Sequence, residues 1–214
     1  MLKLRILQPT DTYPHALPHI YTTNDEVDKY NKDVYDKCSQ LKTIISAQDF
    51  IVGDVTQSVK ESMKSRIPSL KLSKTVGLFL HLPVAIGIRY EVCINVRTDD
   101  GLTNGAPGKI MHMDYREQQR TRPTIIWMQF EDQQIGQKWC QQHKHLSSSS
   151  YLMDDAIPVS RDFCVGHIKK AKVLRKQFPK RPPAAKTVHK SQGDTLPQLV
   201  VHLPYSKLHF QLTV

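Results

Sequence analysis

Apolar residues recur at helical spacing near the start of the chain. Four of them lie three or four residues apart: Val27, Tyr30, Val34 and Cys38. This spacing predicts a helix whose start Asn24 or Asp25 would cap. The short apolar segment 18–21 before it predicts a strand. A second helix is predicted over 57–66, and Pro68 would end it.

From about residue 75 the pattern changes to short apolar runs separated by turn residues. These runs predict strands over 90–96, 109–115, 123–130, 157–165 and 172–178. Between the first two runs, the Asp100-Gly101 and Asn104-Gly105 dipeptides favour a hairpin. Several short strands with Gly-rich turns are typical of a small barrel or sandwich. We read the later segment 184–191 as helical, 192–197 as a loop and 198–203 as a strand.

These elements predict a mixed α/β chain in which a β-rich insertion separates two α/β segments. We place the first α/β segment at residues 1–74, the β-rich insertion at 75–176 and the return to α/β structure at 177–214. No internal repeat is found in the sequence.

Charge is the compositional feature that changes this picture. The 214 residues carry a formal net charge of +10, with 39% hydrophobic residues. This balance favours anionic partners such as nucleic acid, although a basic protein without such a role stays an alternative. The four cysteines are far apart and form no CxxC pair, which favours reduced thiols. No run approaches 18 apolar residues and no signal peptide is recognised, so we expect a soluble intracellular chain and no membrane partner.

The segment 187–194 combines groups that bind phosphate. Lys190 offers a cation, Ser191 a hydroxyl and Gly193 a backbone that an anion can approach closely. His189 and Gln192 add further polar groups. The segment is therefore a candidate for binding a DNA phosphate or a nucleotide. The alternative is a helix that ends at a glycine with basic residues in its last turn.

A basic run precedes this segment. Between Asp162 and Asp194 there are nine Lys or Arg residues and no acidic one. The candidate DNA contacts within it are Lys169, Lys170, Lys172, Arg175, Lys176, Lys180 and Arg181. Such a strip would follow a phosphate backbone, with Phe178 stacking on a base. A nuclear localisation signal and a solvated strand face are the alternatives.

Other candidate sites are weaker. Cys140, His143 and His145 lie close together, but a structural zinc site takes four ligands, so a polar loop is the preferred interpretation. The pairs Asp99–Asp100 and Asp154–Asp155 are interpreted as turn residues. The sequence thus predicts no catalytic residue and no metal site.

Three segments resemble motifs of the Pif family of DNA helicases, which are RecD-like enzymes of superfamily 1B. "AKTVHKSQGDT" resembles a late family motif, Thr-x-His-Lys-Ser-Gln-Gly. "GLTNGAPGKI" is similar to the family's GLxNGxxG hairpin, and "IYTTNDEVDKYN" to its Thr-Asn-x-x-Val-x-x-x-Asn segment. The three occur in family order and cover about residues 21–203.

The resemblance implies the C-terminal portion of such a helicase: a second, incomplete RecA-like domain interrupted by an SH3-like β-barrel insertion. ATP with Mg²⁺ would bind between this domain and the N-terminal RecA-like domain of the same protein. Its hydrolysis would drive 5′-to-3′ movement along single-stranded DNA or at DNA junctions, in replication, repair or recombination. We expect the protein in the nucleus, with mitochondrion or cytoplasm as alternatives.

The resemblance also implies roles for particular residues. Thr187, His189, Lys190 and Ser191 would face DNA or the domain cleft. Gln192 and Gly193 would lie nearer the nucleotide phosphates.

The sequence departs from the family in the parts that hydrolyse ATP. It contains no G-x-x-x-x-G-K-[ST] motif, and the lookalike "GAPGKI" at 105–110 has the wrong glycine spacing. Neither the acidic Mg²⁺-binding strand nor the family's arginine-bearing segment is found. We therefore expect no ATP hydrolysis by this chain alone. The alternatives are a non-enzymatic basic module that binds single-stranded nucleic acid, a decayed mobile-element helicase fragment, or a protein-interaction domain.

Overall fold

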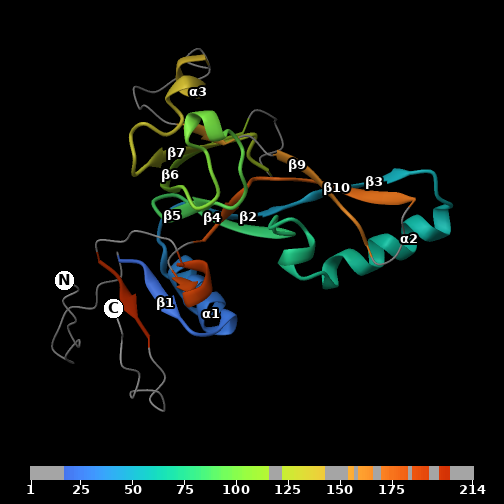
Figure 1. The fold of residues 1–214 in the computed structure, drawn as a ribbon, viewed down its shortest axis with the longest axis horizontal. Coiled ribbons are helices and arrows are strands. Elements are labelled where there is room, and N and C mark those ends of the chain that lie inside the picture. The colour runs from blue at the N-terminus through green and yellow to red at the C-terminus, as the bar shows by residue number, and fades with distance from the viewer. Residues whose placement is uncertain are drawn as a thin grey trace. The chain divides into compact units, whose positions relative to one another are not determined.

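The computed structural model describes residues 17–115, 122–142, 154–156, 159–165, 170–182, 185–192 and 198–202 (Figure 1). The described residues before Lys37 and after Pro182 form one compact unit, which we call the terminal unit. The residues from Lys37 to Pro182 form the second, the central unit. The compact units divide the chain at other residues than the predicted domains, whose boundaries at 75 and 176 stay a prediction.

The terminal unit is built on three short parallel strands. They are β1 (His19–Tyr21), β12 (Ala185–Thr187) and β13 (Val200–Val201), in the order β12-β1-β13. Helix α1 (Asn24–Lys37) follows β1, and a single 3₁₀ turn (Val188–Lys190) follows β12. The predicted helix over 184–191 is therefore wrong. Residues 185–187 instead pair with β1, which supplies a partner strand that local sequence does not reveal.

Helix α1 begins with a reciprocal cap. The Thr23 N–H donates to the Glu26 carboxylate at 3.1 Å, and the Glu26 N–H donates to the Thr23 hydroxyl at 3.3 Å. This pair is a capping box, which satisfies two backbone donors that a helix start leaves unpaired. The cap is thus Thr23, and the prediction of Asn24 or Asp25 is corrected.

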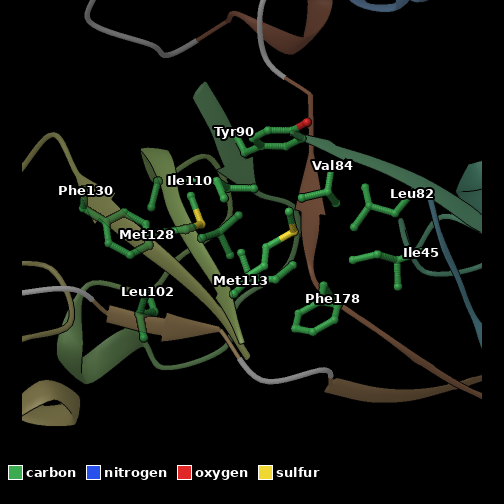
Figure 2. Close-up of a cluster of buried hydrophobic side chains, with 13 residues drawn as sticks. Ile45, Leu82, Val84, Tyr90, Leu102, Ile110, Met113, Met128, Phe130 and Phe178 are labelled. Atoms are coloured by element: carbon green, nitrogen blue, oxygen red, sulfur yellow. The ribbon is translucent and has the colours of Figure 1, made fainter. Parts of the chain in front are cut away.

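The largest sheet of the central unit has five strands in the order β11-β5-β6-β7-β8. The strands are β5 (Arg89–Val92), β6 (Pro107–Asp114), β7 (Ile125–Phe130), β8 (Asp154–Ala156) and β11 (Lys180–Arg181). Figure 2 shows the buried cluster on this sheet, in which Ile110 and Met128 meet Leu82 and Val84 from β4 (His81–Ala85). Among the described strands the sheets are open, and no closed barrel is found, so the SH3-like barrel stays a prediction.

Residues 37–74 belong to the central unit because their strands pair there. Strand β2 (Lys42–Ser46) pairs with β4, and β3 (Gln48–Gly53) pairs with β10 (Ala171–Gln177). Strand β10 also pairs with β9 (Val159–Phe163). Helix α2 (Gln57–Arg66) covers one face of this three-stranded sheet, where Met63 and its neighbour Ile67 pack with residues of β9 and β10. The pairing of β2 with β4 and the long-range pairing of β3 with β10 therefore join residues 37–74 to the central unit.

The remaining elements are short. They are the 3₁₀ turns Ile67–Ser69, Leu72–Lys74 and Thr98–Asp100, and helix α3 (Gln137–Gln142). Most predicted strands and the helix over 57–66 are confirmed. Strand β8 was missed, and it corrects the interpretation of Asp154–Asp155 as a turn. None of the helices in the described part of the chain is long and apolar enough to span a membrane.

The glycines of "GLTNGAPG" serve the connection between β5 and β6. Gly105 has a φ of +95°, a conformation that side chains disfavour. A Cβ atom on Gly108 would lie 2.9 Å from the carbonyl oxygen of Gln129 on the paired strand β7. The segment 105–110 runs into a strand, with Ile110 fully buried, whereas a P-loop runs into a helix. The rejection of this segment as a P-loop is confirmed.

Candidate nucleic-acid interface

The segment after β12 has a defined backbone. Thr187 is buried at the end of the strand, while His189 and Lys190 on the 3₁₀ turn are exposed. The Ser191 hydroxyl donates to the carbonyl of Val188 at 2.9 Å, and the Ser191 N–H lies 3.2 Å from the carbonyl of Thr187. The turn therefore presents the side chains of His189 and Lys190 to solvent on a hydrogen-bonded frame.

This turn lies at the edge of the sheet where open α/β folds bind ligands. Parallel pairing places Tyr21 of β1 beside Thr187 of β12, so both strands end at the same edge. The segments that leave this edge are 22–24 and 188–192. Ligands in open α/β sheets lie outside the carboxyl ends of the strands. The segment 188–192 therefore leaves the sheet at the edge where ligands of such folds lie, and its role in binding stays a prediction.

Asn31 joins the two segments that carry the family resemblance in this unit. Its side-chain oxygen accepts from the N–H of Ala185 at 2.9 Å, and its amide nitrogen lies 3.5 Å from the carbonyl of the same residue. Helix α1 thus holds the start of β12 through one side-chain amide. In "TNDEVDKYN", Thr23 caps the helix, Val27 is buried and Asn31 binds the strand that leads to Lys190.

The positive charge of Lys190 acts on the Asp28 carboxyl of helix α1. Burial raises the pKa of the Asp28 carboxyl, and the nearby Lys190 cation acts in the opposite direction. Asp25 adds a smaller effect that raises this pKa further. An acidic group therefore borders the exposed lysine, and this limits the positive potential on the side of α1.

The basic run does not form one strip, because most of it is a strand. Side chains alternate between the two faces of β10: Arg175 is buried, whereas Lys172 and Lys176 are exposed. Helix α2 covers the face that holds Arg175. A run of basic residues in a strand is therefore divided between core and solvent.

Arg175 is fixed in the interior, with 1% of its surface exposed. Its Nε and Nη2 donate to the two carboxylate oxygens of Asp49, both at 2.7 Å. Its Nη1 donates to the carbonyl of Leu78 at 3.0 Å, and its guanidinium lies 5.2 Å from the centre of the Phe163 ring. Because only 1% of its surface is exposed and three of its N–H groups are bound in the interior, the guanidinium does not reach a phosphate at the surface. The expectation that Arg175 contacts DNA is corrected.

Lys180 and Arg181 are also directed into the central unit. The Nζ of Lys180, a residue that is 2% exposed, lies 5.3 Å from the centre of the Phe130 ring. Arg181 forms an ion pair with buried Glu91, with Nη2 and Oε2 3.0 Å apart. The predicted phosphate contact of Lys180 is therefore corrected. A phosphate that binds Arg181 would have to compete with the Glu91 carboxylate for its guanidinium. Phe178 is fully buried in the core (Figure 2), which corrects its predicted stacking on a base.

Some predicted positions lie outside the described residues. Gly193, His143 and His145 are among them, and so is the side chain of Cys140. Gln192 is described and exposed next to the 3₁₀ turn. In the part of the chain that the structure describes, no three His, Cys, Asp or Glu side chains gather as metal ligands would.

A histidine pair in the terminal unit was missed by the sequence analysis. Nδ1 of His19 and Nε2 of His202 are 2.9 Å apart, and the His202 ring stacks on Tyr21 with the ring centres 4.0 Å apart. Burial lowers the pKa of His202, and Glu26 acts in the opposite direction. The two histidines are 183 residues apart in the chain, so no local pattern brings them together.

The described fold matches solved helicase structures. A crystal structure of Pif1 helicase from Candida albicans has a TM-score of 0.58 at 18% identity, covering 91% of this chain and 41% of that one. The chain has the fold of a portion of a Pif1 helicase. Bacteroides Pif1 bound to ssDNA has a TM-score of 0.53 at 17% identity, covering 88% of this chain and 35% of its own. The structure of Bacteroides Pif1 in complex with ADP-AlF3 and ssDNA has a TM-score of 0.53 at 17% identity, covering 92% of this chain and 37% of that one.

The Pif1 fold confirms the resemblance seen in the three sequence segments. The chain spans less than half the length of each of these Pif1 structures. Neither the protein-family models nor the curated proteins gave a match. The comparison therefore rests on the fold, and the mixed α/β class is shown by it.

Proposed function

We propose that this chain supplies the second motor domain of an ATP-dependent DNA helicase and contacts single-stranded DNA with the segment after β12. One observation carries the proposal: Asn31 and the β1–β12 pairing hold the segment 188–192 at the carboxyl edge of a parallel sheet, within a Pif1 fold. Solved Pif1 structures include one bound to ssDNA. In this proposal His189, Lys190 and Ser191 contact the DNA backbone, and buried Thr187 positions them.

The proposed parent enzyme would use ATP and Mg²⁺, with Gln192 and Gly193 near the phosphates. The described residues fit only one side of such a site, because Gln192 is an exposed amide at the strand edge. The cations and backbone amides that cradle triphosphates belong to the P-loop, which this sequence lacks. A first RecA-like domain would have to supply them. When bound, the nucleotide would drive the change in cleft geometry that moves the DNA.

The direct test is binding of labelled oligo(dT) to the full chain, measured by fluorescence anisotropy across a salt series. Lys190→Ala should weaken binding and lower the log–log salt slope by about 0.7, the value for one phosphate contact on a single strand. Lys32→Ala is the matched control: it removes a lysine of α1 that pairs with Asp36 on the exposed helix surface. Equal binding by wild type and Lys190→Ala would refute the contact.

Two further assays address catalysis. We expect no DNA-stimulated phosphate release from this chain alone, and measurable release would overturn the proposed division of the ATP site. Joined to a P-loop domain of the same fold, the chain should support unwinding of duplexes with a 5′ tail in preference to a 3′ tail. If ATP hydrolysis is never restored while DNA binding persists, the non-enzymatic binding module is the better interpretation.

The proposed setting is replication, repair or recombination in the nucleus. The segment "KRPPAAK" is a poor linear import signal in the folded chain, because Lys180 is buried and Arg181 is held by Glu91. A fluorescent fusion of the full chain tests the compartment. Nuclear accumulation that survives substitution of both residues by Gln would show that this segment is not the signal.

A further inference from the structure

One face of the central unit combines apolar and basic side chains in contact with solvent. Three cross-strand pairs of β3 and β10 define it: Gln48 with Lys176, Phe50 with Leu174, and Val52 with Lys172. We call these six residues the outer face. Figure 1 shows β3 and β10 as adjacent strands, and α2 covers the opposite face of their sheet.

The exposure of this face is unusual for a sheet that has one covered side. Phe50 is 52% exposed and Val52 is 57% exposed, and Leu174 between the two lysines is partly exposed. Sheets with one solvated face usually carry polar residues there. Exposed apolar side chains that lie together mark an interaction site more often than a scattered surface apolar residue does.

The charge on the face selects the class of partner. Among the described side chains of β3 and β10, the outer face carries Lys172 and Lys176 and no carboxylate, because Asp49 lies on the inner face with Arg175. Strand β9 borders the face beyond β10, where the register places Asp162 beside Leu174. A polyanion would therefore approach over the β3 side of the pair.

The spacing of these groups fits a single strand of nucleic acid. Lys172 and Lys176 are four residues apart, about 13 Å along the strand, which is the length of about four nucleotides in a stacked strand. Phe50 pairs with Leu174, midway between the two lysines. Basic residues that flank an exposed aromatic ring are the combination with which proteins hold single strands without reading their sequence.

We propose that the outer face of β3 and β10 is a second contact for single-stranded nucleic acid, in which Phe50 stacks on a base while Lys172 and Lys176 contact phosphates. This site lies in the central unit, whereas the segment 188–192 lies in the terminal unit. The proposal rests on the proposed function and extends it, because it adds a second contact for single-stranded DNA. Phe50 takes the stacking role that the buried Phe178 cannot perform.

The test uses the full chain and labelled oligo(dT) at about 50 to 200 mM salt, where phosphate contacts change affinity steeply. Phe50→Ala should weaken binding about fivefold to 100-fold, the range for loss of one stacked base. Phe50→Trp should keep wild-type affinity, because it retains a ring. Val96→Ala, which trims another exposed apolar residue of the central unit, should bind as wild type does.

The lysines are tested by their salt dependence. Lys172→Gln and Lys176→Gln should each lower the slope by about 0.7. Lys64→Gln is the matched control, since this exposed lysine lies on α2 and the same charge is removed on the other side of the sheet. Circular dichroism melts establish that each variant is folded. Photocrosslinking from 5-iododeoxyuridine should map to the peptide that contains Phe50.

The outcomes separate this proposal from the proposed function. If Lys190→Ala weakens binding and Phe50→Ala does not, the outer face is not a DNA contact and the proposed function stands. If the reverse holds, the outer face binds DNA and the segment after β12 does not. No binding by wild type at low salt overturns both. If Phe50→Ala instead abolishes self-association in sedimentation while DNA affinity is unchanged, the face is a protein contact and the proposal fails.

Discussion

The ion pair of Arg175 and Asp49 decides whether the basic run acts on DNA or stabilises the fold. Asp49→Ala removes both acceptors of the bidentate pair and leaves a guanidinium with 1% exposure and one remaining bond, to the Leu78 carbonyl. Breaking one side of a buried pair costs about 3–5 kcal/mol. At about 2–4 °C per kcal/mol for a chain of this size, the melting temperature should fall by about 6–20 °C.

The second half of this prediction concerns removal of both charges. The double variant Asp49→Ala with Arg175→Met should lose clearly less stability than the sum of the two single variants, because no uncompensated charge remains in the interior. A matched control is Glu131→Ala, which breaks the pair with Arg89. Glu131 in that pair is 55% exposed, so its loss should cost at most about 1 kcal/mol.

Thermal unfolding by circular dichroism measures the stabilities, and oligo(dT) binding measures the role in DNA contact. We expect Arg175→Met to leave the salt slope of binding unchanged wherever the variant is folded. A wild-type melting temperature for Asp49→Ala, or a slope lowered by about 0.7 in Arg175→Met, would refute the reasoning. The second result would mean that Arg175 leaves its pocket to contact a phosphate.

Three further predictions concern other parts of the chain. Asn31→Ala should leave the buried backbone of Ala185 without its side-chain partner, which costs about 1–3 kcal/mol and should raise amide exchange in β12; unchanged exchange there would contradict the role given to Asn31. Burial lowers the pKa of His202 in the folded state. As the pH falls below about 6.5, the ordinary pKa of histidine, the unfolded chain therefore binds a proton at His202 more readily than the folded chain does. The stability of the terminal unit should be complete above this pH and decrease as the pH falls below it, and a melting temperature that rises on acidification would contradict this sign. Burial raises the pKa of the Cys93 thiol to about 11, so at pH 8 iodoacetamide should modify exposed Cys164 much faster than Cys93, and equal rates would show that Cys93 is accessible as a thiolate.

The sequence was sufficient to predict those elements whose signals lie within a few neighbouring residues. The helix over 57–66 was predicted with the boundaries that the structure gives, since an apolar stripe and Pro68 define it. Turn dipeptides located the connection between β5 and β6, and short apolar runs separated by turn residues located five strands. The segment 188–192 was chosen from its residue types together with its resemblance to a helicase motif. The tertiary structure then placed it at the edge of a parallel sheet.

Errors arose where a distant partner decides the structure. Residues 185–187 form a strand because β1 pairs with them, and no local feature of "AAKTVH" reveals β1. The sequence counted Arg175 with its basic neighbours, yet alternation along β10 directs it toward Asp49, 126 residues away. The run "KVLRKQF" has adjacent apolar residues, Val173 and Leu174, so the sequence does not show which residues of the strand face the core.

The sequence by itself determined most of the elements, the excess of positive charge and the residues able to bind phosphate, because these depend on neighbours in the chain. Only the tertiary structure decided which basic residues meet solvent. That choice depends on which face of the β3–β10 pair helix α2 covers, which leaves Phe50 and Lys176 outside and Arg175 inside. Burial of a charge requires a partner in the right place, and long-range strand pairing supplied Asp49.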